Sequence, residues 1–283
     1  MRILPSRIPR RASPSARHPF LSWVACILIA ALCTWLAPAD AGASQGEVMR
    51  VATRPGVTVP LFTAWRPDAV ATLVLFSGGA GGYGKLGDDG WPGSGNFLIR
   101  TGKLWASQPF NLVMVGRPSD GIDLGEGAIR VGAEHLADNM ALLAAVRARN
   151  PAPIWLVGTS MGTISAAATA IADEAGIVSG LVLTSSVTGF RVRGAVPTQD
   201  LGRIKAPTLV IHHTKDACRI CAPHEARDIA ARLVSAPIKR TVMVEGGSGE
   251  TGNPCEAFHF HGFIGFEREV VDLIANWIRQ PSN

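Results

Sequence analysis

Hydrophobic residues recur along the chain in six short runs, each followed by turn residues. The runs occupy residues 71–79, 111–120, 154–162, 180–189, 206–216 and 240–249. Nearly continuous stretches of Val, Leu and Ile of this length are typical of strands that are buried on both faces of a parallel sheet. The pattern therefore predicts a central, mostly parallel β-sheet.

Between these runs, apolar residues return at the spacing of an α-helix. Helices of this kind are predicted over residues 133–149, 222–236 and 263–278. The first should end before Pro151, because a proline disfavours the helical conformation in the residue that precedes it. Strands that alternate with amphipathic helices predict an α/β fold, in which helices flank the sheet and ligands bind at the carboxyl ends of the strands.

The first 41 residues differ in character from the rest of the chain. Five arginines before residue 20 precede an uncharged apolar stretch, residues 20–38, and then Ala39-Asp40-Ala41, whose small-x-small form is the kind that signal peptidases cut. We interpret residues 1–41 as a signal peptide that directs the protein to the periplasm or out of the cell. The alternative is a retained membrane anchor, because the apolar stretch is near the ~18 residues that begin to span a bilayer.

Residues 42–283 have a length and composition that suit a single domain. The whole chain is 47% hydrophobic and has a formal charge of +5, but removal of residues 1–41 leaves 22 basic and 21 acidic residues. This balance takes away the main support for a nucleic-acid partner. A membrane partner is expected only if the N-terminal segment is retained, and the oligomeric state is left open.

Ser160 stands where a strand pattern changes to a helical one. It lies between Gly158 and Gly162 in a G-x-S-x-G sequence, after the apolar residues 154–157 and before the small-residue stretch 163–172. Glycines permit a sharp strand-to-helix turn that exposes the serine hydroxyl above the sheet. We interpret Ser160 as a nucleophile rather than as an idle turn residue.

A serine nucleophile needs a base, and the base needs a carboxylate that fixes its tautomer. Asp216 follows the apolar run of a predicted strand and is the expected acid, with a solvated turn carboxylate as the alternative. Two histidines, His259 and His261, compete for the role of base. In an extended segment they would point to opposite sides. His261 is preferred because Gly262 gives its loop the freedom to turn the imidazole inward.

Ser160, Asp216 and His261 follow one another in the order found in the α/β-hydrolase superfamily, which the chain resembles over residues 72–277. The resemblance implies an exported serine hydrolase that cleaves carboxylic esters through an acyl-enzyme. Its partner would be a small-molecule acyl substrate, and no cofactor or metal is required. An acyltransferase or a peptidase on the same fold, and a non-catalytic binding protein, are the alternatives.

The same resemblance implies an oxyanion hole. One donor would be the backbone N–H of Met161, and the second the backbone N–H of Gly79 in the loop after the strand at residues 71–76. Many members of the superfamily carry His-Gly in this loop, whereas this chain has Ser77 followed by glycine. The assignment of Gly79 therefore depends on the loop keeping its shape without the histidine.

The glycines of this loop also match nucleotide-binding patterns. Residues 79–84 read G-x-G-x-x-G, and a lysine follows them. A dinucleotide fingerprint must open a helix, but residues 85–95 are too rich in Gly, Pro and Asp to form one. A phosphate-binding P-loop needs Ser or Thr after the lysine, where this chain has Leu86. Both patterns therefore fail on context.

Three cysteines lie beyond the leader, and in an oxidising compartment two of them should pair. Cys218 follows the predicted acid and Cys255 precedes the predicted base, so a Cys218–Cys255 disulfide would clamp the two loops together. Cys221 would then be left over, and a Cys221–Cys255 pairing is the alternative. The C-x-x-C spacing of Cys218 and Cys221 lacks the thioredoxin-like setting that would favour a redox or metal role.

The sequence leaves no room for a large lid domain. Only residues 184–206 separate the strands predicted near residues 180 and 210, too few for a folded cap. The glycine-rich residues 81–95 are long enough to form a functional loop over the site. We therefore expect an open active site.

Overall fold

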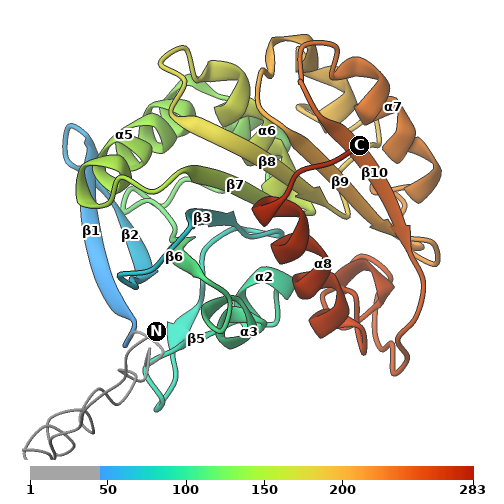
Figure 1. Cartoon of the computed structure of the whole chain (residues 1–283), viewed down its shortest axis with the longest axis horizontal. Helices are drawn as coiled ribbons and strands as arrows, with labels where there is room; N and C mark the ends of the chain where they lie inside the picture. The colour runs from blue at the N-terminus through green and yellow to red at the C-terminus, as the bar shows by residue number, and fades with distance from the viewer. Residues whose placement is uncertain (1–44) are drawn as a thin grey trace, which may run out of the picture. The chain divides into compact units, whose positions relative to one another are not determined.

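A central sheet of eight strands organises the computed structural model, which describes residues 45–283 (Figure 1). Its order is β1-β2-β6-β3-β7-β8-β9-β10. The strands are β1 (Glu47–Arg54), β2 (Val57–Ala64), β3 (Ala71–Phe76), β6 (Phe110–Val115), β7 (Ile154–Thr159), β8 (Val178–Thr184), β9 (Thr208–His213) and β10 (Lys239–Val244). The remaining strands, β4 (Lys85–Leu86) and β5 (Pro92–Gly93), form a separate small ribbon.

Six neighbouring strands, from β6 to β10, pair in parallel, and each corresponds to one of the predicted apolar runs. Strands β3, β6, β7 and β9 are buried along their whole length, as expected for a sheet covered on both faces. Strands β1 and β2 add an antiparallel edge that the sequence reading did not include. The predicted α/β fold with a mostly parallel sheet is confirmed.

Helices cover both faces of the sheet, and each face has its own apolar core (Figure 1). The helices are α2 (Phe97–Arg100), α3 (Gly102–Ala106), α4 (Gly127–Arg130), α5 (Ala133–Arg149), α6 (Met161–Ala172), α7 (Ala226–Arg232) and α8 (Glu267–Arg279). One core joins α2, α3 and α8 to the sheet through residues such as Phe97, Trp105 and Ile274. The other joins α5, α6 and α7 through residues such as Leu143, Ala167 and Ile229.

The predicted helices differ from the observed ones at the start of α8 and at both ends of α7, which stops at Arg232. Helix α5 has the predicted bounds and ends before Pro151. The segment predicted at 222–236 begins with a 3-10 turn, η3 (Pro223–Glu225), before α7. Helix α8 starts four residues late, because Phe263 and Gly265 have φ values of +59° and +68° and a chain with left-handed residues cannot continue a right-handed helix.

The connection from β8 to β9 carries no α-helix. Two 3-10 helices, η1 (Val196–Thr198) and η2 (Leu201–Arg203), are the helices between β8 and β9, and a third, η4 (Phe260–Gly262), precedes α8. Across residues 45–283, no helix combines the length and the apolar composition needed to span a membrane. The predicted signal peptide, residues 1–41, lies outside the described residues.

Candidate active site

Ser160 occupies a strained turn between β7 and α6. Its φ of +51° and ψ of −127° lie where residues other than glycine are rarely found. The backbone N–H of Ser160 donates a hydrogen bond to the Thr184 carbonyl of β8 at 3.1 Å, which ties the turn to the neighbouring strand. The serine is therefore held at the carboxyl end of the central strands in a conformation that the surrounding structure imposes.

Glycines make this turn possible because other chain segments approach it closely. A Cβ atom on Gly162 would lie 1.9 Å from the carbonyl oxygen of Phe76, and one on Gly158 would lie 2.7 Å from the carbonyl oxygen of Gly162. A Cβ atom on Gly78 would lie 2.9 Å from the Cβ of Ser160. The loop after β3 thus packs directly against the serine turn, as an oxyanion hole requires.

Asp216 and His261 form a buried hydrogen-bonded pair. Nδ1 of His261 lies 2.8 Å from Oδ2 of Asp216, and the two side chains are 4% and 0% exposed. Oδ1 of the same carboxylate accepts the backbone N–H of Cys218 at 2.9 Å. Because Nδ1 donates to the carboxylate, the lone pair of the imidazole is on Nε2. The arrangement fixes the tautomer that a general base needs.

The main chain of His261 is fixed as well. Oγ of Ser185, which follows β8, donates to the His261 carbonyl at 2.8 Å. Gly262 approaches another part of the loop so closely that a Cβ atom on it would lie 1.9 Å from the carbonyl oxygen of Ala257. The sequence argument that Gly262 supplies freedom of movement is therefore wrong: this glycine allows tight packing.

The extended segment assumed for the two histidines is also wrong. His259 has extended backbone angles, but the 3-10 helix η4 begins with the next residue, so His259 and His261 do not alternate across a strand. His259 is half-buried and packs edge-on against the ring of Phe260. Of the two histidines, His261 is the one that reaches Asp216 and lines the pocket described next.

A pocket of about 350 Å³ brings Ser160 and His261 to one surface. It is lined by Gly78, Gly79, Ala80, Gly81, Gly82, Ser94, Asn96, Phe97, Thr159, Ser160, Cys255, Glu256, Ala257, His261 and Gly262. Nε2 of His261 is buried and has no hydrogen-bond partner among residues 45–283. The predicted base thus has its lone pair free in the pocket that also contains the predicted nucleophile.

The buried thiol of Cys221 lies within 4.8 Å of a ring nitrogen of His261. Burial raises the pKa of this thiol far above its ordinary value, and the charge of Asp216 raises it further. Cys221 therefore stays protonated, so it cannot act as a thiolate nucleophile at neutral pH.

The two predicted oxyanion donors flank the serine. Met161 is the first residue of α6, where backbone N–H groups have no partner within the helix. Gly79 lies in the loop after β3, has a φ of +56° and lines the pocket. Within this loop Oγ of Ser77 donates to the carbonyl of Gly82 at 2.7 Å, so Ser77 stabilises the loop.

One residue of this region was missed by the sequence reading. Arg130, at the end of α4, is buried and donates hydrogen bonds to the carbonyls of Ser77 and Gly79. No sequence signal distinguishes Arg130 from the arginines at the surface, because its acceptors come from separate parts of the chain.

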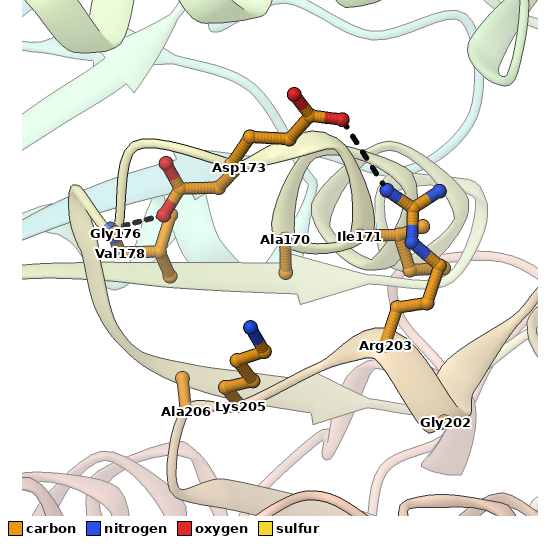
Figure 2. A pocket seen from close by; sticks show the side chains of 10 residues that line it. Ala170, Ile171, Asp173, Gly176, Val178, Gly202, Arg203, Lys205 and Ala206 are labelled. Carbon is orange, nitrogen blue, oxygen red and sulfur yellow. Dashed lines mark hydrogen bonds and ion pairs between the residues drawn. The ribbon is translucent and has the colours of Figure 1, made fainter.

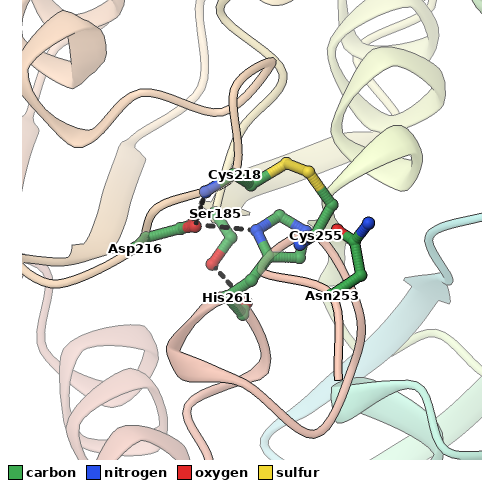
Figure 3. The surroundings of a disulfide bond; sticks show 6 residues. All are labelled: Ser185, Asp216, Cys218, Asn253, Cys255 and His261. Atoms are coloured by element: carbon green, nitrogen blue, oxygen red, sulfur yellow. Dashed lines mark hydrogen bonds and ion pairs between the residues drawn. A yellow bond between two sulfur atoms is a disulfide. The ribbon is translucent and has the colours of Figure 1, made fainter. Parts of the chain in front are cut away.

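A disulfide joins the loops that carry the acid and the base. Cys218 and Cys255 are bonded, with their Cα atoms 4.4 Å apart (Figure 3). Cys221 is the free cysteine among residues 45–283. Figure 3 shows the bridge beside the Asp216–His261 pair, the position at which a clamp would hold the pair together.

The structure also bears on metal and nucleotide binding. Ligand atoms of Cys218, Cys221 and His261 lie within 4.8 Å of one another, but the sulfur of Cys218 is in the disulfide and cannot be a thiolate ligand. The glycine-rich residues 79–84 lead into the ribbon strand β4 and not into a helix. A phosphate therefore has no helix N-terminus to bind there.

A larger cavity, of about 590 Å³, lies away from these residues (Figure 2). Its walls come from the end of α6, the start of β8 and η2, and it contains an ion pair between Glu174 and Arg203 at 3.5 Å. The carboxylate of Asp173 there is occupied by the backbone N–H groups of Ile177 and Val178. This hollow has no nucleophile with a base, so the smaller pocket is the candidate active site.

Comparison with solved structures identifies the fold. No protein-family model and no curated protein matches the sequence. An esterase of Pyrococcus furiosus matches with 13% identity over 84% of this chain and 93% of its own, at a TM-score of 0.58. A dienelactone hydrolase of Anabaena variabilis matches with 15% identity over 84% of this chain and 100% of its own, at a TM-score of 0.56.

A third solved structure, a CIB-like hydrolase of Thermoplasma acidophilum, matches with 18% identity over 83% of this chain and 98% of its own, at a TM-score of 0.51. All three likenesses extend over nearly the whole of the other protein and more than four fifths of this one. Together with the parallel sheet and the serine turn after β7, they show that the chain has the α/β-hydrolase fold.

Proposed function

We propose that the protein is a serine hydrolase that cleaves small carboxylic esters through an acyl-enzyme. The observation that supports this most is the Asp216–His261 pair: Nε2 of His261 has no hydrogen-bond partner among residues 45–283, and His261 lines the pocket that also contains the strained Ser160. A buried imidazole that is oriented by a carboxylate and shares a pocket with a serine at a strained turn is an arrangement that can activate a hydroxyl for attack on a carbonyl.

The chemistry proceeds in two halves. Oγ of Ser160 attacks the ester carbonyl while Nε2 of His261 takes its proton, and the N–H groups of Met161 and Gly79 stabilise the oxyanion. His261 then returns the proton to the leaving alkoxide, which departs as an alcohol and leaves the acyl group on Ser160. Water, deprotonated by His261, then attacks this ester, and His261 returns the proton to Oγ of Ser160 as the acid is released. Asp216 stabilises the imidazolium in both halves.

The pocket favours a small substrate. Its volume of about 350 Å³ is near the lower end of the range for ligand sites, and glycine and alanine make up much of its lining. Short side chains leave backbone amides accessible but supply little apolar surface for a long acyl chain. The solved structures that the chain resembles include esterases and a dienelactone hydrolase, which is consistent with a carboxylic ester as substrate.

Export remains part of the proposal. The basis is the leader sequence at residues 1–41, together with the Cys218–Cys255 disulfide, since such bonds persist mainly in oxidising compartments. N-terminal sequencing of the mature protein and fractionation of producing cells test this point directly. A mature N-terminus near residue 42 supports a cleaved signal peptide, and recovery of the intact leader in membranes would indicate an anchor.

A fluorophosphonate probe tests the nucleophile. The wild-type protein should be labelled at Ser160, and Ser160→Ala should abolish labelling while its circular dichroism spectrum stays unchanged. Ser186→Ala is the matched control, because Ser186 is a buried serine outside the pocket lining. Labelling of a different serine would overturn the assignment. A panel of esters, amides and thioesters with short and long acyl groups then separates an esterase from a peptidase or an acyltransferase.

A further inference from the structure

Arg130 is a buried cation that forms no ion pair among residues 45–283, although the charge of Asp123 acts on it from a distance. Its residue is 1% exposed, and it makes four side-chain hydrogen bonds. Nε donates to the carbonyl of Leu124 at 2.6 Å and Nη1 to Oγ of Ser165 at 2.9 Å. Nη2 donates to the carbonyls of Gly79 at 2.9 Å and Ser77 at 3.3 Å. All four acceptors are neutral oxygens.

Two other arginines, Arg54 and Arg100, are partly buried and are arranged differently. Arg54 forms ion pairs with Asp120 and Asp138, and Arg100 pairs with Glu267. A buried charge without a counter-ion is costly, and proteins normally pair it or leave it at the surface. Burial lowers the pKa of Arg130 to about 9, so the side chain is still protonated at neutral pH. Its retention in this place calls for a compensating role.

The place of the charge indicates what that role is. Two of the four acceptors, the carbonyls of Ser77 and Gly79, belong to the loop that supplies the second oxyanion donor. These carbonyls are part of the peptides on either side of the Gly78–Gly79 peptide, which carries the Gly79 N–H. Because peptides are planar, binding both neighbours restricts the orientation of the amide between them.

The guanidinium of Arg130 is also held by helix α6. Oγ of Ser165 in α6 accepts from Arg130, and its own proton is then available to Nε2 of His135, 2.9 Å away. Burial lowers the pKa of His135 to about 4, and the charge of Arg130 acts in the same direction, so this histidine is neutral and can accept. The network connects the serine helix α6 to the loop after β3 through Arg130.

We propose that Arg130 is a positioning residue of the oxyanion hole: it fixes the peptides on both sides of the Gly79 amide and places a positive charge behind the point where negative charge develops. The inference rests on the proposed function, and it goes further by assigning a role to a residue outside the triad. A preorganised amide and a fixed positive charge stabilise a transition state more than a neutral ground state. The loss should therefore fall on kcat and not on KM.

The test compares Arg130→Met with Arg54→Met. Both changes remove a guanidinium, but Arg54 lies on β1 and binds Asp120 and Asp138, whereas Arg130 binds the loop after β3. With a short-chain p-nitrophenyl ester, Arg130→Met should lower kcat about 100-fold, the size of effect seen when an oxyanion donor is lost, and should change KM less than about threefold. Arg54→Met should lower the melting temperature and leave kcat nearly unchanged. Equal kcat values for the two variants would overturn the proposal.

Two further measurements keep the test decisive. If Arg130→Met does not fold, Arg130→Lys keeps the charge but cannot bridge the same carbonyls, so its kcat should still fall at least tenfold; an unchanged kcat would contradict the proposal. The affinity of the Arg130 variants for a boronic acid that forms a tetrahedral adduct should fall in parallel with kcat.

End-point labelling of the wild-type protein with a fluorophosphonate separates this inference from the proposed function. No labelling would reject the hydrolase. Normal labelling together with an unchanged kcat in the Arg130 variants would reject only the role of Arg130.

Discussion

The carboxylate of Asp216 binds two partners at once: Nδ1 of His261 at 2.8 Å through one oxygen and the backbone N–H of Cys218 at 2.9 Å through the other. The second bond fixes the rotation of the carboxylate and so directs the first oxygen at the imidazole. Two loops that are separated by more than 30 residues therefore meet in one hydrogen-bonded unit.

Asp216→Asn should lower kcat by about 10⁴-fold, because an amide that donates to Nδ1 stabilises the wrong tautomer of His261. The substitution preserves size, so the melting temperature should change little. Steady-state hydrolysis of a short-chain ester measures the loss, with Asp228→Asn, an exposed acid on α7, as the matched control. A loss of less than tenfold would remove Asp216 from the triad.

His261→Ala should reduce kcat by several powers of ten, whereas His259→Ala should change it only a few-fold. His261 binds Asp216 and lines the pocket, while His259 packs against Phe260. The two variants are assayed side by side with the same ester, and circular dichroism establishes that both are folded. Comparable losses would mean that the histidines act together, and the reverse order would transfer the role of base to His259.

Loss of the Cys218–Cys255 bridge should lower activity at least as early as it lowers stability. The cysteines are 37 residues apart, and the chain-entropy model gives such a loop roughly 3 to 4 kcal/mol of stabilisation. Activity and melting temperature are followed together as a reductant is added, and again in Cys218→Ser with Cys255→Ser. Peptide mapping without reductant identifies the bridge. Full activity in a protein with three alkylatable thiols beyond the leader would contradict the clamp.

Stability should fall as the pH is lowered from 6.5 towards 5. Burial lowers the pKa of His212 and of His135 from 6.5 to about 4, so each is neutral in the folded chain and gains a proton on unfolding within this window. Because the unfolded chain binds more protons, the free energy of unfolding decreases with falling pH, by about 2 kcal/mol per ring at pH 5.

Urea unfolding at pH 7 and pH 5 measures this dependence. His212→Gln, which keeps an acceptor for the Ser186 N–H, should reduce the difference between the two pH values by about half. His224→Gln, at an exposed position, is the control and should leave the difference as it is. The same pH dependence in all three proteins would contradict the assignment to His212.

The central sheet and the serine turn could be predicted because their signals are local. The buried strands have continuous apolar runs, and Gly158 and Gly162 surround Ser160 within one short stretch. The sequence did not predict the antiparallel strands β1 and β2. Strand β1 is mostly exposed or half-buried, so it has no continuous apolar run. Strand β1 is stabilised by pairing with β2, and this pairing cannot be recognised from the residues of β1 alone.

The roles of His261 and Arg130 depend on contacts that the local sequence does not show. The sequence favours His261 on the expectation that Gly262 makes its loop mobile. In the structure a glycine is needed at this position because the carbonyl oxygen of Ala257 lies too close for a side chain. That contact joins positions within the loop whose approach depends on the folded chain. Arg130 gave no signal at all, because a cation that is solvated by carbonyls from Leu124, Ser77 and Gly79 acquires its role only when those segments meet.

The disulfide also determines which movements the pocket can make. With Cys218 bonded to Cys255, the acid loop and the base loop are joined both covalently and through Asp216 and His261, and they should shift as one body. Ser160 is held separately, by β7 and α6 and by its backbone bond to Thr184 of β8. The bridge therefore restricts the separation of Asp216 and His261 directly, and the separation of Ser160 and His261 only through the end of β8, where Ser185 binds the His261 carbonyl. A chain without the bridge should lose the alignment of the acid and the base before it loses the position of the serine.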